Sequence, residues 1–168
     1  MKFNLFIYIL FFSSFSYSSN QYETVLDELD DAWRFVFLSD DKILYTEMPG
    51  ALKVASLDDK SIVEVKNVPE VQYVSQGGLS EVILDPNFIE NKKIYLSYSA
   101  KNSNNKSTLF LMSAELVGNE LKNNKVIFEA NAPRRTAVHL GAKIAFKQDG
   151  TLLLASGDGF DHREKAQK

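Results

Sequence analysis

The chain has 168 residues, of which 45% are hydrophobic and 24% are charged, and it contains no cysteine. This composition is typical of a soluble globular domain and excludes collagen-like and long disordered chains, while the lack of cysteine excludes disulfides, thiolate metal sites and thiol nucleophiles. The formal charge is -3, without the basic footprint of nucleic-acid-binding proteins, so we expect no nucleic-acid partner.

Residues 1–18 have the pattern of a secretory signal peptide. Lys2 supplies a positive start, residues 5–12 are apolar without interruption, and small serines follow at the exit, which places the cleavage after Ser18. The apolar run is shorter than the ~20 residues that cross a bilayer, so a retained anchor is the less favoured alternative. We therefore expect residues 19–168 to form a mature chain without a membrane span, in the periplasm or secreted.

The rest of the sequence predicts antiparallel strands joined by tight turns. Runs of β-branched and aromatic residues alternate with Asp, Pro and Gly. The expected strands are WRFVFL (33–38), KILYTE (42–47), ALKVAS (51–56), SEVILDP (80–86), KIYLSYS (93–99), STLFLMSAEL (107–116), KVIFEA (125–130) and a hairpin within 142–159. Apolar residues on one helical face make a helical turn over 23–32 an open alternative, and we expect one short helix at most.

These strands fall into repeated units. Aligning Phe37-Leu38, Ile83-Leu84 and Ala145-Phe146 gives offsets of 46 and 62 residues. Sheets of about four strands that recur every ~40 to 50 residues are typical of a β-propeller. The chain accounts for roughly two and a half blades, whereas a propeller closes with about four to eight. We expect an all-β partial propeller of antiparallel four-stranded meanders, either the front part of a longer protein or an arc that pairs with another copy.

Few residues can carry chemistry. His139 immediately precedes an expected strand, so it should project from a strand mouth, where an imidazole can accept a hydroxyl proton. One blade earlier, Gln76-Gly77-Gly78 also precedes a strand. Paired glycines let a backbone approach a ligand, and the Gln76 amide can donate and accept. A packed histidine and a tight turn explain these positions equally well, and the loop 158–164 is either a set of ligand contacts or a solvated turn.

Other chemistries lack support. The sequence has no EF-hand spacing, no glycine-rich phosphate cradle and no nucleophile elbow. Calcium loops, nicotinamide chemistry and serine hydrolysis are therefore not indicated, and we assign no metal ligand in this chain.

Three segments, in order, resemble the glucose/sorbosone dehydrogenase family, the PQQ-dependent aldose sugar dehydrogenases. They are WRFVFLSDDKILYTEMPGALKV, QGGLSEVILDPNFIENKKIYLSYS and HLGAKIAFKQDGTLLLASGDG followed by FDHREKAQ. The resemblance runs from about Trp33 to the end of the chain, and its most specific string is QGG-x-x-x-V-x-LDP-x-F. It implies a six-bladed β-propeller, with residues 19–168 as its N-terminal part.

The resemblance also implies a reaction and site residues. The family oxidises the anomeric carbon of aldoses to lactones by hydride transfer to pyrroloquinoline quinone (PQQ), and an external electron acceptor completes the cycle. His139 matches the general base that takes the anomeric hydroxyl proton. Gln76 matches a residue that lines the cofactor and sugar pocket. The implied partners are therefore an aldose and an electron acceptor.

Departures from the family pattern refine this implication. Val138 stands where the glucose-oxidising branch carries an Asp next to the base, which favours the broader aldose branch and implies that this orienting carboxylate is absent. In the family, the calcium ligands and the cations that hold PQQ lie in later blades, so this chain by itself is expected to be inactive. The alternative is a non-catalytic secreted propeller that binds a carbohydrate or a protein.

Overall fold

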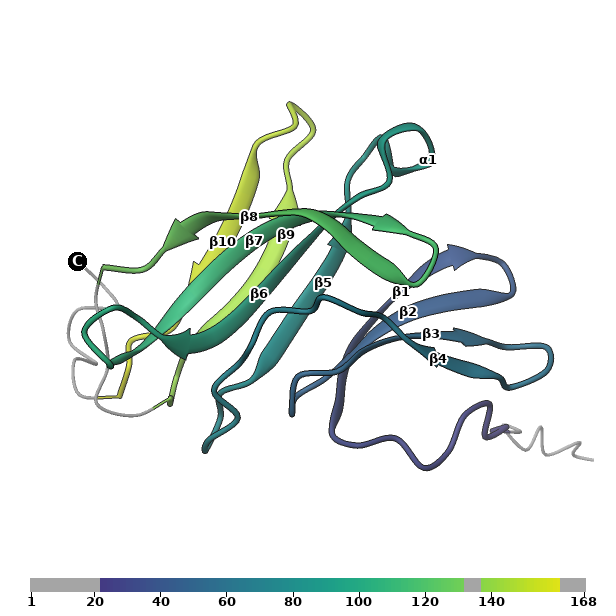
Figure 1. Ribbon diagram of the computed structural model, residues 1–168, viewed down its shortest axis with the longest axis horizontal. Coiled ribbons are helices and arrows are strands. Elements are labelled where there is room, and N and C mark those ends of the chain that lie inside the picture. Colours follow the sequence, from purple (N-terminus) through teal and green to yellow (C-terminus); the bar gives the residue numbers. More distant parts are fainter. Residues whose placement is uncertain (1–21, 132–136, 161–168) are drawn as a thin grey trace, which may run out of the picture.

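The computed structural model describes residues 22–131 and 137–160, in which ten strands form three antiparallel sheets in chain order (Figure 1). The first sheet holds β1 (Ala32–Ser39), β2 (Lys42–Glu47), β3 (Leu52–Ser56) and β4 (Ile62–Glu64). The second holds β5 (Leu79–Leu84), β6 (Lys93–Lys101), β7 (Ser107–Val117) and β8 (Glu120–Glu129), and the third holds β9 (Gly141–Phe146) and β10 (Leu152–Ser156). Two four-stranded sheets and a hairpin confirm the partial propeller. The proposed signal peptide lies outside the described residues.

Two short elements differ from the predictions. The helical turn considered over 23–32 is wrong, because residues 22–29 have no regular structure there and Leu26 instead packs against a cluster on the first sheet. A helix does occur within the described residues, but it is α1 (Phe88–Asn91), because Asp85 accepts hydrogen bonds from the Asn87 amide and the Asn91 side chain and closes a turn after β5. No described helix is long and apolar enough to span a bilayer.

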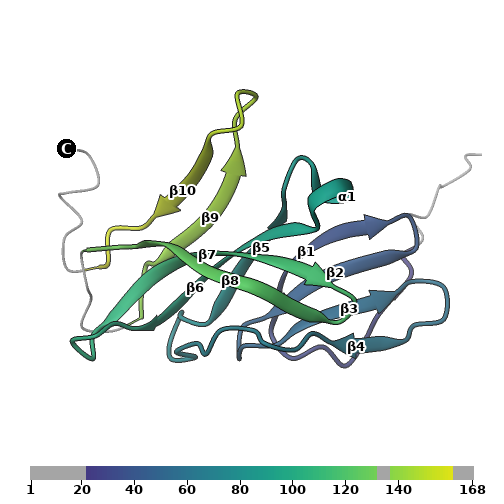
Figure 2. The same cartoon turned by 45° about the horizontal axis from the view of Figure 1, so that its top comes forward.

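Apolar side chains hold the sheets together face to face, as blades pack in a propeller. The largest cluster joins the first two sheets and includes Leu44, Leu52, Leu79 and Leu96, all fully buried. A smaller cluster joins the second sheet to the hairpin through Ile83, Leu111 and Ile144. The turned view in Figure 2 shows the three sheets fanning out beside one another. Burying apolar area between neighbouring sheets is thus the main force that orders them.

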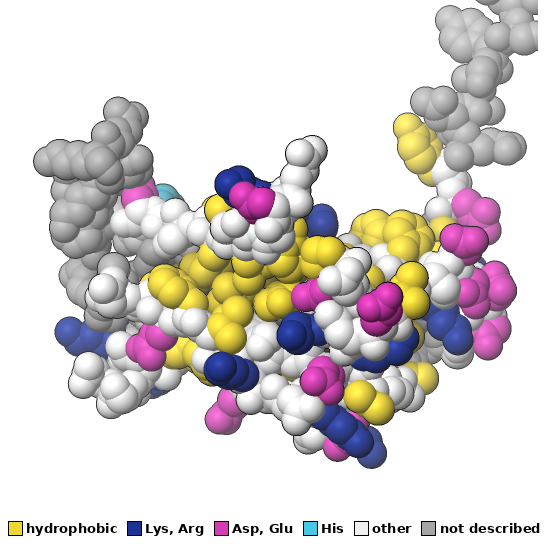
Figure 3. All heavy atoms as spheres, turned by 90° about the horizontal axis from the view of Figure 1, so that it is seen from above, with side chains coloured by type: hydrophobic (Ala, Val, Ile, Leu, Met, Phe, Trp, Pro, Cys, Tyr) yellow, Lys and Arg dark blue, Asp and Glu magenta, His cyan; other side chains and the backbone are white. Residues whose placement is uncertain are grey.

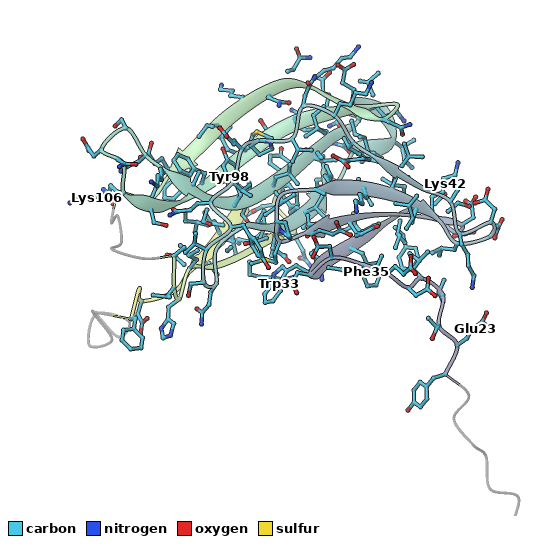
Figure 4. All side chains as sticks on the ribbon, turned by 60° about the horizontal axis from the view of Figure 1, so that its bottom comes forward. Glu23, Trp33, Phe35, Lys42, Tyr98 and Lys106 are labelled. Atoms are coloured by element: carbon cyan, nitrogen blue, oxygen red, sulfur yellow. The ribbon has the colours of Figure 1, made fainter. Side chains whose placement is uncertain are left out.

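The open sides of the arc carry exposed apolar residues. Trp33, Phe35 and Phe37 on β1 are each more than half exposed, and Figure 4 shows Trp33 and Phe35 on the outside of that strand. Hydrophobic side chains also gather across the centre of the face seen in Figure 3. This is the exposure expected of a propeller arc whose end blades lack neighbours.

Buried hydroxyls link successive sheets in a repeated way. Thr46 on β2 donates to the carbonyl of Ser80 on β5 at 2.8 Å, and Ser97 on β6 donates to the carbonyl of Ala142 on β9 at 2.6 Å. Both hydroxyl residues are fully buried. Because the second strand of one sheet bonds to the first strand of the next, the first strands β1, β5 and β9 are fixed relative to one another near their beginnings.

Candidate functional site

A cavity of about 640 Å³ opens where the first strands of the three sheets begin. Asp31 and Trp33 line it from the start of β1, Tyr73 and Gln76 from the loop before β5, and His139 from the segment before β9. Cavities of about 300 to 1,000 Å³ are typical of small-molecule sites. The segments that line it are far apart in sequence, so the packing of the three sheets creates it.

The loop that carries Gln76 is pinned at both ends to Ser99 on β6. The Gln72 amide donates to the Ser99 carbonyl at 2.7 Å, and the Gly78 amide donates to Ser99 Oγ at 2.7 Å. A Cβ on Gly77 would lie 2.5 Å from Ser99 Oγ, and one on Gly78, at φ +149°, would lie 2.1 Å from the Met48 carbonyl oxygen. The two glycines therefore approach neighbouring protein segments, and this corrects the view that they let the backbone approach a ligand.

The two residues singled out from the sequence meet directly. The backbone amide of His139 donates to Gln76 Oε1 at 2.9 Å, and the backbone amide of Gln76 donates to the carbonyl of Ala137 at 3.0 Å. Both side chains line the cavity. Because the amide oxygen of Gln76 accepts from His139, the group that this amide offers to a ligand is its NH2 donor.

The His139 ring is oriented by a carboxylate. His139 Nδ1 lies 2.8 Å from Asp158 Oδ1, which also accepts the Phe160 backbone amide at 2.8 Å. The Phe160 ring packs edge-on against the imidazole at 5.2 Å. With Nδ1 directed at the carboxylate, Nε2 is the ring nitrogen that could take a proton from a ligand. His139 itself has a left-handed backbone with φ 46°, and such strained residues cluster at functional sites.

A carboxylate other than the one that Val138 replaces orients the histidine. Val138 supplies none, but Asp158 does so from 19 residues downstream. The sequence assigned Asp158 only to a loop that either contacts a ligand or forms a solvated turn. The overlooked signal was the hairpin itself, since antiparallel pairing of β9 with β10 returns the chain to the end where His139 lies. Asp161 to Glu164, the rest of that predicted loop, lie outside the described residues.

An ion group centred on a buried carboxylate lies at the next positions along the first strands of the three sheets. Glu81 on β5, only 5% exposed, has Oε2 2.8 Å from Lys143 Nζ on β9 and Oε1 3.6 Å from Arg34 Nε on β1. Trp33 and Ser80, the residues directly before Arg34 and Glu81, line the cavity. The Glu81 carboxylate thus ties all three sheets together next to the site. The described residues contain no cluster of three or more side chains suited to hold a metal ion.

Comparisons with known proteins agree with this architecture. The sequence profile of the Glucose / Sorbosone dehydrogenase family matches residues 29–168. The aldose sugar dehydrogenase YliI of Escherichia coli (strain K12) is 28% identical over 148 residues, which is 86% of this chain and 40% of that protein.

Solved structures give the same result. A glucose dehydrogenase crystal structure matches with a TM-score of 0.79 and 31% identity, covering 86% of this chain and 42% of that chain. The PQQ-bound form of an aldose sugar dehydrogenase from Streptomyces coelicolor has a TM-score of 0.68 and 20% identity, a likeness of fold, over 82% of this chain and 41% of that one. The present chain therefore spans about two fifths of the length of these relatives.

Proposed function

The chain belongs to the glucose/sorbosone dehydrogenase family, and on this premise we propose that it supplies part of a PQQ-dependent sugar dehydrogenase that oxidises the anomeric carbon of aldoses to lactones. One observation carries the proposal: His139 and Gln76, from two different loops between sheets, meet at one cavity, and a carboxylate orients the histidine. Hydroxyl oxidation needs a base for the hydroxyl proton, and a neutral donor and apolar lining residues such as Trp33 and Leu140 suit the binding of a small neutral substrate.

The residues present fit one side of the cofactor. The NH2 of Gln76 suits a quinone oxygen or a sugar hydroxyl, and the Trp33 ring, which lines the same cavity, gives a flat apolar surface. PQQ, when bound, supplies the acceptor for the hydride that leaves the sugar. Among the described residues, no lysine or arginine lines the cavity. We propose that the cations for the PQQ carboxylates, and the ligands of the family's calcium ion, come from outside this part of the chain.

In the proposed mechanism His139 is the general base. Its Nε2 accepts the proton of the anomeric hydroxyl, which raises the electron density at the carbon that loses the hydride. Asp158 accepts a hydrogen bond from Nδ1–H, so the ring keeps the tautomer whose Nε2 carries no proton, and the carboxylate stabilises the imidazolium once the proton has moved. General base catalysis of this kind contributes about 10²- to 10⁴-fold in rate.

The test is aldose-dependent dye reduction by the protein that carries this segment, after addition of PQQ and calcium. His139→Ala should lower kcat by about 10²-fold or more, and Asp158→Asn should also lower kcat, because the ring loses its charged partner and the tautomer that it fixes. Asp149→Asn is the matched control, because Asp149 makes its contacts in the turn at the far end of the same hairpin. A His139→Ala variant with full activity would refute the base, and a wild-type protein that oxidises no aldose would favour the non-catalytic binding alternative.

We also propose that residues 1–18 direct export and are removed, so that the protein acts in the periplasm or outside the cell. Mass spectrometry of the mature protein checks this. A mature chain that begins at Ser19 supports the proposal, and one that retains Lys2 contradicts it.

A further inference from the structure

One wall of the cavity is not used by the proposed mechanism. Asp31 and Tyr73 line it from segments 42 residues apart, and the Tyr73 hydroxyl donates to Asp31 Oδ2 at 2.5 Å. Trp33 lies two residues after Asp31 and is 61% exposed toward solvent. We call these three residues the acidic wall. It joins the start of the first sheet to the loop that also carries Gln76.

The acidic wall is held in place before any ligand binds. Asp31 has φ 48°, and its carbonyl accepts the Met48 amide at 3.0 Å, while the Met48 carbonyl accepts the Leu79 amide at 3.0 Å. Asp31 is thereby tied through Met48, the residue after β2, to β5. Tyr73 directly follows Gln72, the residue bonded to Ser99. Backbone bonds thus set the position of both partners, which lowers the entropy lost when a ligand binds them.

The chemistry of the acidic wall suits a polyhydroxylated ligand. An ionised carboxylate accepts several hydrogen bonds, and the short bond from Tyr73 uses one position on one oxygen. That same bond raises the pKa of the Tyr73 hydroxyl, which keeps it a donor at neutral pH. An aromatic ring such as that of Trp33 offers an apolar face for the C–H side of a pyranose. A carboxylate that accepts hydrogen bonds from hydroxyls, next to an apolar ring, is suited to bind a neutral sugar.

Resting on the function proposed above, we propose that the acidic wall selects the sugar, with Asp31 accepting a hydrogen bond from a ring hydroxyl away from the anomeric carbon. Asp31 and Tyr73 are then specificity-determining residues, while His139 acts on the anomeric hydroxyl from the segment before β9. A site built to bind a particular hydroxyl rejects an analogue that lacks it, because the polar group of the site is left without its partner. Tyr73 fixes the carboxylate, so its loss should relax selectivity without removing the acceptor.

The test compares Asp31→Asn, Asp31→Gly and Tyr73→Phe in the full protein used for the dye assay, with an aldose and its series of monodeoxy analogues. Glycine deletes the carboxylate without strain at the left-handed position. For the parent aldose, Asp31→Asn and Asp31→Gly should raise KM by about 10- to 100-fold with a much smaller change in kcat, since a bond to a charged group is lost. One deoxy analogue should keep its KM in these variants. Asp27→Asn, an exposed carboxylate outside the cavity, is the control.

Two results overturn the proposal. One is an unchanged KM for the parent aldose in both Asp31 variants, and the other is an equal rise of KM for every analogue, which a merely structural role of Asp31 would produce. A second readout is fluorescence, taken as the difference in emission between the full protein and its Trp33→Phe variant, because the Trp33 ring lines the cavity. Titration with the aldose should change its emission, and Asp31→Asn should shift the midpoint by the same factor as KM. Absence of any aldose oxidation by the wild-type protein refutes the proposed function instead, so the two failures are distinct.

Discussion

The ion group of Glu81, Arg34 and Lys143 allows a sharp test of how the three sheets are held together. The Glu81 carboxylate lies 3.6 Å from Arg34 Nε and 2.8 Å from Lys143 Nζ. At an effective dielectric constant of about 20, the Coulomb attraction in each pair is about 5 kcal/mol, before the cost of removing water from the charges. The Arg34 and Lys143 side chains are 40% and 55% exposed, however, and solvent screening reduces each such pair to about 1 kcal/mol. Each cation should therefore be replaceable at small cost while the other remains.

Removing both cations is a different perturbation. Glu81 is 5% exposed, so the double variant Arg34→Met/Lys143→Met leaves a buried carboxylate without a cation. Losing both cations should lower the free energy of unfolding by about 3 to 5 kcal/mol, whereas the effects of the two single variants should add up to about 2 kcal/mol. The excess is the coupling between the two sites.

Urea unfolding followed by circular dichroism measures these free energies of unfolding. Adding Glu81→Gln to the double variant should recover stability, because the uncompensated charge is removed. Lys147→Met is the control, since its partner Asp149 is exposed, and it should change stability by less than about 0.5 kcal/mol. Strict additivity in the double variant, or no recovery on adding Glu81→Gln, would refute the reasoning.

Three further predictions concern stability. The Tyr45 hydroxyl is buried without a hydrogen-bond partner among the described residues. Tyr45→Phe should therefore leave the free energy of unfolding unchanged or raise it by up to about 1 kcal/mol. A clear loss of stability in a urea titration would contradict this. Gly78→Ala should lower the free energy of unfolding by about 3 kcal/mol or more, or prevent folding, because Gly78 has a left-handed φ and the new Cβ would collide with the Met48 carbonyl. A Tm close to that of the wild type would contradict this prediction. Burial raises the pKa of the Tyr98 hydroxyl above its usual 10.0, so its contribution to stability is complete below that pH and is lost as pH rises through the folded-state pKa. Tyr98→Phe should therefore make the fall in stability between about pH 9 and pH 11 shallower, and an unchanged slope in alkaline urea titrations would contradict this.

Most of the strand pattern was predictable because its signals are local. β2 and β6, for example, are rich in β-branched and aromatic residues, and turn residues flank β2. The repeat of such runs also predicted two and a half blades. The three-residue strand β4 was missed because Ile62–Glu64 is too short to stand out from a loop, and it forms by pairing with β3.

The segment before β1 shows where local signals mislead. Its apolar spacing fits one face of a helix, yet Leu26 is placed against Ile43, Tyr45 and Ala55 of the first sheet. An apolar residue indicates only that its side chain will be buried. The surface that buries it depends on sheets formed by other parts of the chain.

The candidate site was likewise predictable from the sequence only in part. His139 and Gln76 were recognisable because each precedes a strand within a motif, but their contact spans 63 residues, and Asp158 and the acidic wall had no comparable signal. The order of residues along the chain sets which side chains stand at strand ends. Which of those ends meet depends on how neighbouring sheets bury their apolar faces against one another, and that packing brings a base, its carboxylate and a second acidic group to one cavity.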